Sequence, residues 1–109
     1  MTHAVLFSPE AQEDLLSLYT YIAQHSGSRR AFSYVERLTD YCQSFSTFPE
    51  RGTQRADLRP GLRVIGFASR ITIAFHIASQ TVVIDRILYA GRALEDELPA
   101  QGDLDSLPT

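Results

Sequence analysis

The sequence has one cysteine, one methionine, no tryptophan and no lysine among its 109 residues. A single cysteine excludes a disulfide framework and is typical of a reducing compartment, so we expect a cytoplasmic protein without a signal peptide. No apolar run approaches the roughly 18 residues of a membrane-spanning helix, so we expect no membrane partner. The three histidines have no metal-ligand spacing and no glycine-rich phosphate loop is present, so we predict neither a metal nor a cofactor.

What the chain does contain is the composition of one globular domain. Hydrophobic residues make up 44% of the chain, with five Tyr and six Phe, which is enough for a core without disulfides or metal. We place a single domain at residues 1–98. Residues 99–109 are interpreted as an acidic, flexible tail.

Charge is distributed unevenly along the chain. Residues 1–50 carry a net charge of -3, residues 51–92 carry +5, and residues 93–109 carry -5. All ten basic residues are Arg, which indicates either the codon bias of a GC-rich genome or selection for the planar guanidinium group. The basic middle segment predicts a surface for an acidic macromolecular partner.

The first half of the chain has the pattern of a strand followed by two helices. A short strand is predicted at residues 3–8, and Ser8 before Pro9 is a typical helix start. An apolar stripe at helical spacing follows and stops at Gly27. Ser28 is expected to cap a second helix ended by Pro49, and this helix has the apolar stripe Ala31, Val35, Leu38, Cys42 and Phe45. Helices joined by about three residues lie antiparallel.

Residues 62–91 contain three runs typical of antiparallel strands. In the middle run, one face holds Ile71, Ile73, Phe75 and Ile77, and the other holds Arg70, Thr72, Ala74 and His76. We therefore predict an α+β fold: a two-layer sandwich in the order strand, helix, helix, strand, strand, strand. The sheet is mostly antiparallel, the helical hairpin covers one face, and a short helix follows at residues 92–98.

The uncovered face of the sheet holds the candidate chemistry. His76 is a general acid or base, or else a solvated strand residue. Tyr89 stacks on a base or donates a proton, or else is a partly buried structural tyrosine. Asp85 is expected on the opposite face from Arg86 because side chains alternate along a strand. Four arginines either bind a phosphate or carboxylate there or are simply solvated: Arg59, Arg63, Arg86 and Arg92.

Three segments carry a family resemblance. They are SPEAQEDLLSLYTYIAQ at residues 8–24, DLRPGLR at residues 57–63 and VVIDRILYAGR at residues 82–92. In this order they resemble the ParE branch of the RelE/ParE toxins of bacterial type II toxin-antitoxin systems, over residues 5–98. The resemblance implies a cytoplasmic toxin that is neutralised by a ParD-like antitoxin. When free, such a toxin inhibits DNA gyrase and is not an enzyme.

The sister branch of this superfamily consists of ribosome-dependent messenger RNA endonucleases, which is the alternative hypothesis. Those nucleases are basic and need groups that stabilise the scissile phosphate and move a proton. This chain is acidic, and it lacks a general base unless His76 or Tyr89 serves. Members of the family often have His at the position of Tyr89 and Asp at that of Ala93. We therefore expect a gyrase inhibitor without sequence-specific binding of nucleic acid.

Two binding surfaces follow from this hypothesis. The predicted gyrase contact consists of Arg59, Arg63, Arg86, Tyr89 and Arg92, with the segment after Gly91. The predicted antitoxin contact lies in grooves beside Leu15, Tyr19 and Ile22 and along an open sheet edge, which suit a partner's helix and strand.

Overall fold

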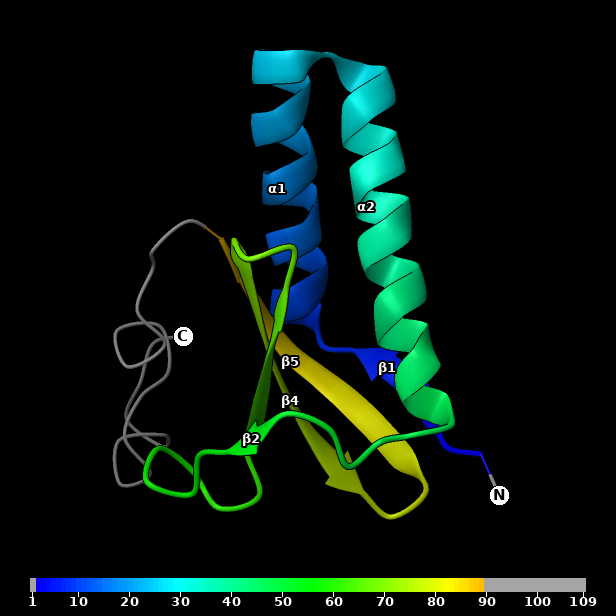
Figure 1. Ribbon diagram of the computed structural model, residues 1–109, viewed down its shortest axis with the longest axis vertical. Coiled ribbons are helices and arrows are strands. Elements are labelled where there is room, and N and C mark those ends of the chain that lie inside the picture. The colour runs from blue at the N-terminus through cyan, green and yellow to red at the C-terminus, as the bar shows by residue number, and fades with distance from the viewer. Residues whose placement is uncertain (1, 90–109) are drawn as a thin grey trace.

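The computed structural model describes residues 2–89, which form a helical layer and a sheet layer (Figure 1). The sheet has the order β1-β5-β4-β3-β2, in which β1 pairs with β5 in parallel and the other pairs are antiparallel. The elements are β1 (Ala4–Phe7), α1 (Pro9–Ser26), α2 (Ser28–Gln43), the 3₁₀ turn η1 (Ser44–Ser46), β2 (Thr53–Gln54), β3 (Arg63–Phe67), β4 (Ile71–Ala78) and β5 (Thr81–Tyr89).

This arrangement confirms the predicted α+β fold, with the hairpin of α1 and α2 on one side of the sheet (Figure 1). The short helix expected at residues 92–98 and the domain boundary at residue 98 lie outside the described residues. Within the described part, no helix is long and apolar enough to cross a membrane.

The start of α1 follows the sequence signals, whereas the start of α2 does not. The Ser8 hydroxyl accepts a hydrogen bond from the Ala11 amide at 3.0 Å and donates one to the Asp85 carbonyl at 2.9 Å, so the same side chain caps α1 and ties it to β5. Gly27 alone separates the helices and has a φ of 95°, a conformation that glycine adopts at little cost. The predicted cap by Ser28 was wrong, because Ser28 is already the first residue of α2 and no side chain caps that helix.

The main core lies between the helices and the sheet face that carries the alternating isoleucines. Ile71, Ile73 and Phe75 of β4 are buried there, as predicted, and the rings of Phe45 and Phe75 are 4.8 Å apart. Leu38 and Cys42 of α2 are fully buried in the same cluster. Burial of these apolar side chains holds the two layers together.

A β-bulge in β5 changes which side chains share a face. Ala74 pairs with Arg86 and Phe75 pairs with Ile84, so Asp85 is an extra residue without a partner across β4. The bulge interrupts the alternation, so Asp85 and Arg86 both lie on the face opposite the main core, where Arg86 pairs with Ala74 and Asp85 contacts His76. The prediction that they point to opposite faces was therefore wrong.

The second face of the sheet is not an arginine surface alone. A smaller apolar cluster lies on it, made of Leu62, Ala74 and Leu88 with Leu58 and Val64 against them. Leu58 belongs to the loop before β3, so this loop covers part of the face. The two-residue strand β2 in the same loop region was not predicted, because two exposed polar residues have no periodicity to read.

Candidate functional site

A cluster of three ionisable side chains lies beside the bulge on the second face of the sheet. His76 Nδ1 and Asp85 Oδ2 are hydrogen-bonded at 2.7 Å, and the Arg59 guanidinium lies 3.7 Å from the same carboxylate oxygen. Burial raises the pKa of Asp85 above its usual value, against the hydrogen bond and charge of His76 and the charge of Arg59, which lower it. The loop that carries Leu58 onto the sheet also places Arg59 here.

This cluster has the chemistry of a proton-transfer site. When Asp85 is ionised it accepts the Nδ1 proton of His76, which leaves Nε2 as the basic nitrogen of a neutral imidazole. The His76 side chain is 36% exposed, whereas that of Asp85 is 14% exposed. A buried carboxylate that orients a more exposed imidazole is an arrangement that supports general base chemistry.

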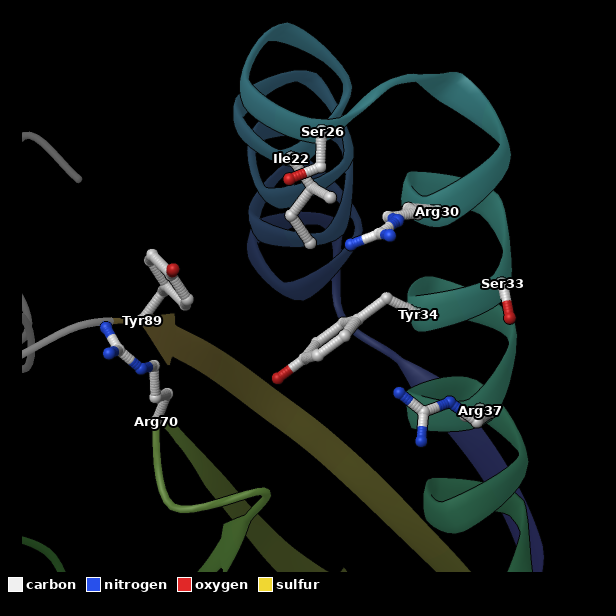
Figure 2. A pocket seen from close by; sticks show the side chains of 8 residues that line it. All are labelled: Ile22, Ser26, Arg30, Ser33, Tyr34, Arg37, Arg70 and Tyr89. Carbon is white, nitrogen blue, oxygen red and sulfur yellow. The ribbon is translucent and has the colours of Figure 1, made fainter.

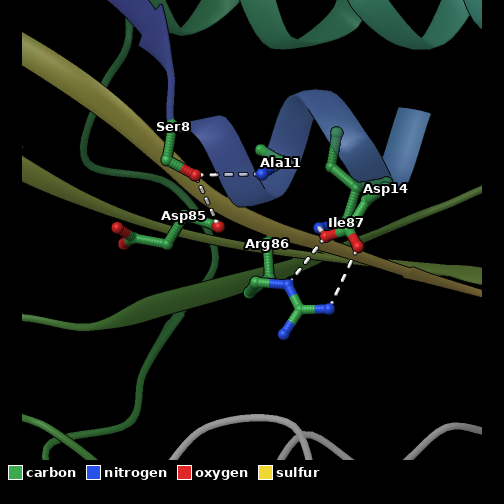
Figure 3. A network of polar contacts seen from close by, with 6 residues as sticks. All are labelled: Ser8, Ala11, Asp14, Asp85, Arg86 and Ile87. Carbon is green, nitrogen blue, oxygen red and sulfur yellow. Dashed lines mark hydrogen bonds and ion pairs between the residues drawn. The ribbon is translucent and has the colours of Figure 1, made fainter. Parts of the chain in front are cut away.

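Arg86 has a different environment from the one predicted for a target contact. Its Nε and Nη2 atoms donate hydrogen bonds to the Asp14 carboxylate at 2.8 and 3.0 Å, and the Ile87 amide donates a third at 2.8 Å (Figure 3). The side chains of Arg86 and Asp14 are only 17% and 10% exposed. Asp14 thus joins α1 to the part of β5 that extends past β1. Arg86 stabilises this junction through its two hydrogen bonds to Asp14.

The structure does not bring the predicted gyrase contacts into one surface. Arg59 lies on the second face beside Asp85, whereas Tyr89 pairs with the core residue Ile71 and contacts the helical layer. The Arg63 Nε donates a hydrogen bond to the Arg51 carbonyl at 2.8 Å. The remaining member, Arg92, lies outside the described residues.

A cavity of about 410 Å³ opens between the helical hairpin and the end of β5 (Figure 2). Tyr34 reaches across it from α2, while Arg70 stands on the opposite side in the turn before β4. Arg70 was predicted on the other face of the sheet, with His76, and that placement was wrong. The cavity is lined by Ile22, Ser26, Arg30, Ser33, Tyr34, Arg37, Arg70 and Tyr89.

The three residues predicted to contact an antitoxin are all half-buried on α1. Leu15 and Ile22 pack against the main core, and Ile22 also lines the cavity. Other apolar side chains of the helices are more accessible, since Leu16 is 67% exposed and Phe32 is 62% exposed. Sequence reasoning missed these two because they lie off the apolar stripes.

The sequence model of the family described as "ParE toxin of type II toxin-antitoxin system, parDE" matches residues 5–94. The chain is 31% identical to Toxin ParE3 of Caulobacter vibrioides over 75 residues, which cover 69% of this chain and 74% of that protein.

Two solved structures have a similar fold. The chromosomal ParDE toxin-antitoxin system from P. aeruginosa gives a TM-score of 0.72 at 18% identity, covering 82% of this chain and 97% of that chain. The toxin-antitoxin complex RelBE2 from Mycobacterium tuberculosis gives a TM-score of 0.59 at 19% identity, covering 84% of this chain and 95% of that chain. At these identities the likeness shows a shared fold.

Proposed function

Because this chain belongs to the ParE toxin family of type II toxin-antitoxin systems, we propose that it inhibits DNA gyrase when free and is neutralised by a ParD-like antitoxin. The observation that carries this proposal is the family match over residues 5–94. We also propose that the toxin acts by binding, without catalysis, in the cytoplasm.

The antitoxin part of the proposal is supported by the surface of the helical hairpin. Exposed Leu16 and Phe32 offer apolar contacts on α1 and α2, and the cavity beside Ile22 offers a recess for side chains of a partner. Both structural neighbours were also solved as toxin-antitoxin systems.

The proposal of a non-catalytic toxin is supported by the engagement of its arginines. An RNA-cleaving site needs several cationic groups that converge on one phosphate. Here Arg86 is held by Asp14, Arg63 is hydrogen-bonded to a backbone carbonyl, and Arg55 pairs with Asp57 at 2.9 Å. These three guanidinium groups are directed to protein acceptors.

One observation favours the alternative of RNA cleavage. The pair of His76 and Asp85 supplies a proton acceptor, and Arg59 nearby supplies positive charge. The sequence alone did not identify this combination. In a nuclease, His76 would take the 2'-hydroxyl proton and Arg59 would stabilise the phosphate. This function depends on His76, whereas gyrase inhibition does not.

The experiment adds the purified chain to a gyrase supercoiling reaction and, separately, to translating ribosomes. The wild type and His76→Ala are compared in both. We expect both proteins to inhibit supercoiling equally and neither to cut messenger RNA. Cleavage of ribosome-bound messages that is lost in His76→Ala, with supercoiling unaffected, would establish the alternative.

A further inference from the structure

The cavity between the helical hairpin and the end of β5 is positively charged. Arg30 and Arg37 line it from α2, and Arg70 lines it from the turn before β4 (Figure 2). None of the described lining residues is an acid, and among residues 2–89 no ion pair joins these three guanidinium groups to a carboxylate. Like charges around one recess repel one another, so an anion bound there lowers the free energy.

Tyr34 lies among these charges. It reaches across the cavity from α2 (Figure 2), and the Arg37 guanidinium lies 5.5 Å from the centre of its ring. Burial and the nearby Tyr89 raise the pKa of Tyr34, against the charges of Arg37 and Arg70, which lower it. The hydroxyl is therefore protonated at neutral pH, and it makes no hydrogen bond to another residue in the described part of the chain. Two guanidinium groups and one free hydroxyl donor are thus available to the same anion.

An aromatic platform adjoins these donors. The Tyr89 ring lines the cavity from β5 and lies 5.2 Å from the Tyr21 ring, which lies 4.2 Å from the ring of His25. Ile22 lines the recess from α1. A planar aromatic group, such as a nucleobase, stacks on a tyrosine ring held in this way. The fitting ligand therefore combines a planar aromatic group with several negative charges.

The size of the cavity and the spacing of its arginines define the ligand further. The volume of about 410 Å³ falls within the range of roughly 300–1,000 Å³ that small-molecule sites occupy. Arg30 and Arg37 are seven residues apart, which is about two helical turns or roughly 10.5 Å along the axis. A chain of phosphates spans more of this row than a single phosphate does.

We propose that this cavity binds a purine nucleoside triphosphate, with its base against Tyr89 and its phosphates on Arg30, Arg37 and Arg70. The Tyr34 hydroxyl donates a hydrogen bond to a phosphate oxygen. Guanidinium groups here take the place of the backbone amides that a glycine-rich loop supplies. All of these residues belong to the free chain, so the inference depends on neither gyrase nor an antitoxin.

The test measures binding of ATP and of GTP to the free chain by calorimetry, at about 50 mM salt and without divalent cations. Inorganic tripolyphosphate and a single-stranded DNA oligonucleotide are titrated in the same way. The variants are Arg37→Gln/Arg70→Gln and Tyr89→Leu. Arg29→Gln is the matched control, because Arg29 is exposed on α2, loses the same charge and does not line the cavity. Circular dichroism verifies that each variant is folded.

We expect at least one of the two nucleotides to bind the wild type. The double arginine variant should weaken this binding about tenfold or more, and the control should change it less than about twofold. Tyr89→Leu should weaken nucleotide binding about fivefold through the loss of stacking. The same variant should leave the binding of tripolyphosphate unchanged, because that anion has no base.

Four results would overturn the inference. The first is a folded wild type that binds neither nucleotide at millimolar concentration. The second is an equal loss of affinity in the double variant and in Arg29→Gln, which would make the effect one of net charge. The third is tripolyphosphate bound as tightly as the nucleotides, which would leave no place for a base. The fourth is an oligonucleotide bound about a hundredfold more tightly than either nucleotide, which would make the ligand a nucleic acid. None of these results affects the proposed function, since gyrase and antitoxin are absent from the experiment.

Discussion

Replacing Asp14 by Ala tests whether Arg86 is primarily a structural residue. The Asp14 carboxylate accepts two hydrogen bonds from Arg86 and one from the Ile87 amide, and both charged side chains are largely shielded from water. The change removes a carboxylate partner of a mostly buried guanidinium and the acceptor of an amide at the edge of β5. A buried amide without an acceptor costs about 1–3 kcal/mol, and an ion pair broken from one side costs about 3–5 kcal/mol.

We expect Asp14→Ala to lower the free energy of unfolding by about 3 kcal/mol, below the sum of these costs because neighbouring groups relax. For a domain of this size that corresponds to a fall in Tm on the order of 12 °C. Asp14→Asn keeps an acceptor for the Ile87 amide and should lose about 2 kcal/mol. Urea denaturation followed by circular dichroism measures both values.

Glu13→Ala is the matched control, since Glu13 is an exposed acid on the same turn of α1. It should change the free energy of unfolding by less than about 0.5 kcal/mol. If Asp14→Ala costs no more than this control, the junction between α1 and β5 contributes nothing to stability and Arg86 has no structural role there. The result also determines how a loss of toxicity in Arg86→Ala is interpreted. If Arg86 contacts the target, this variant should lose more toxicity than its loss of folded protein explains.

Three further predictions concern other parts of the fold. Gly52→Ala should destabilise the chain by about 2 kcal/mol or more in urea denaturation, because Gly52 has a φ of 71° and a Cβ there would overlap the Val64 carbonyl. Burial raises the pKa of the Cys42 thiol to about 12, so a thiol reagent at pH 8 should label the native chain only after denaturant unfolds it. The raised pKa of Asp85 means that the folded state binds this proton more tightly than the unfolded state, so its contribution to stability falls as pH rises above 3.8. Asp85→Asn should remove this contribution, so that between pH 3.8 and the raised pKa the Tm of the variant falls less, or rises more, with pH than the Tm of the wild type.

The layers of the fold could be predicted because periodicity reports burial directly. The alternation in β4 and the apolar stripe of α2 both reflect contact with the main core, and the structure confirms both. The Ser8 cap was equally predictable, since it depends on neighbouring residues alone. Such signals are local in the chain.

The candidate site could not be predicted because it depends on departures from periodicity. A single bulged residue puts Asp85 and Arg86 on the same face, and no sequence rule marks that residue. The partner of Arg86 is 72 positions away, and an acid in the first turns of a helix is usually explained by the dipole alone. The cavity joins side chains from α1, α2, the turn before β4 and β5, so its arginines look unrelated in the chain.

A supercoiling titration tests whether this chain is a toxin that binds gyrase and is released from it by an antitoxin. Increasing amounts of the purified chain are added to gyrase and relaxed plasmid, with and without an equimolar ParD-like antitoxin. We expect supercoiling to be inhibited by the chain alone and restored when the antitoxin is present. Supercoiling that continues unchanged at every concentration of folded chain would contradict it.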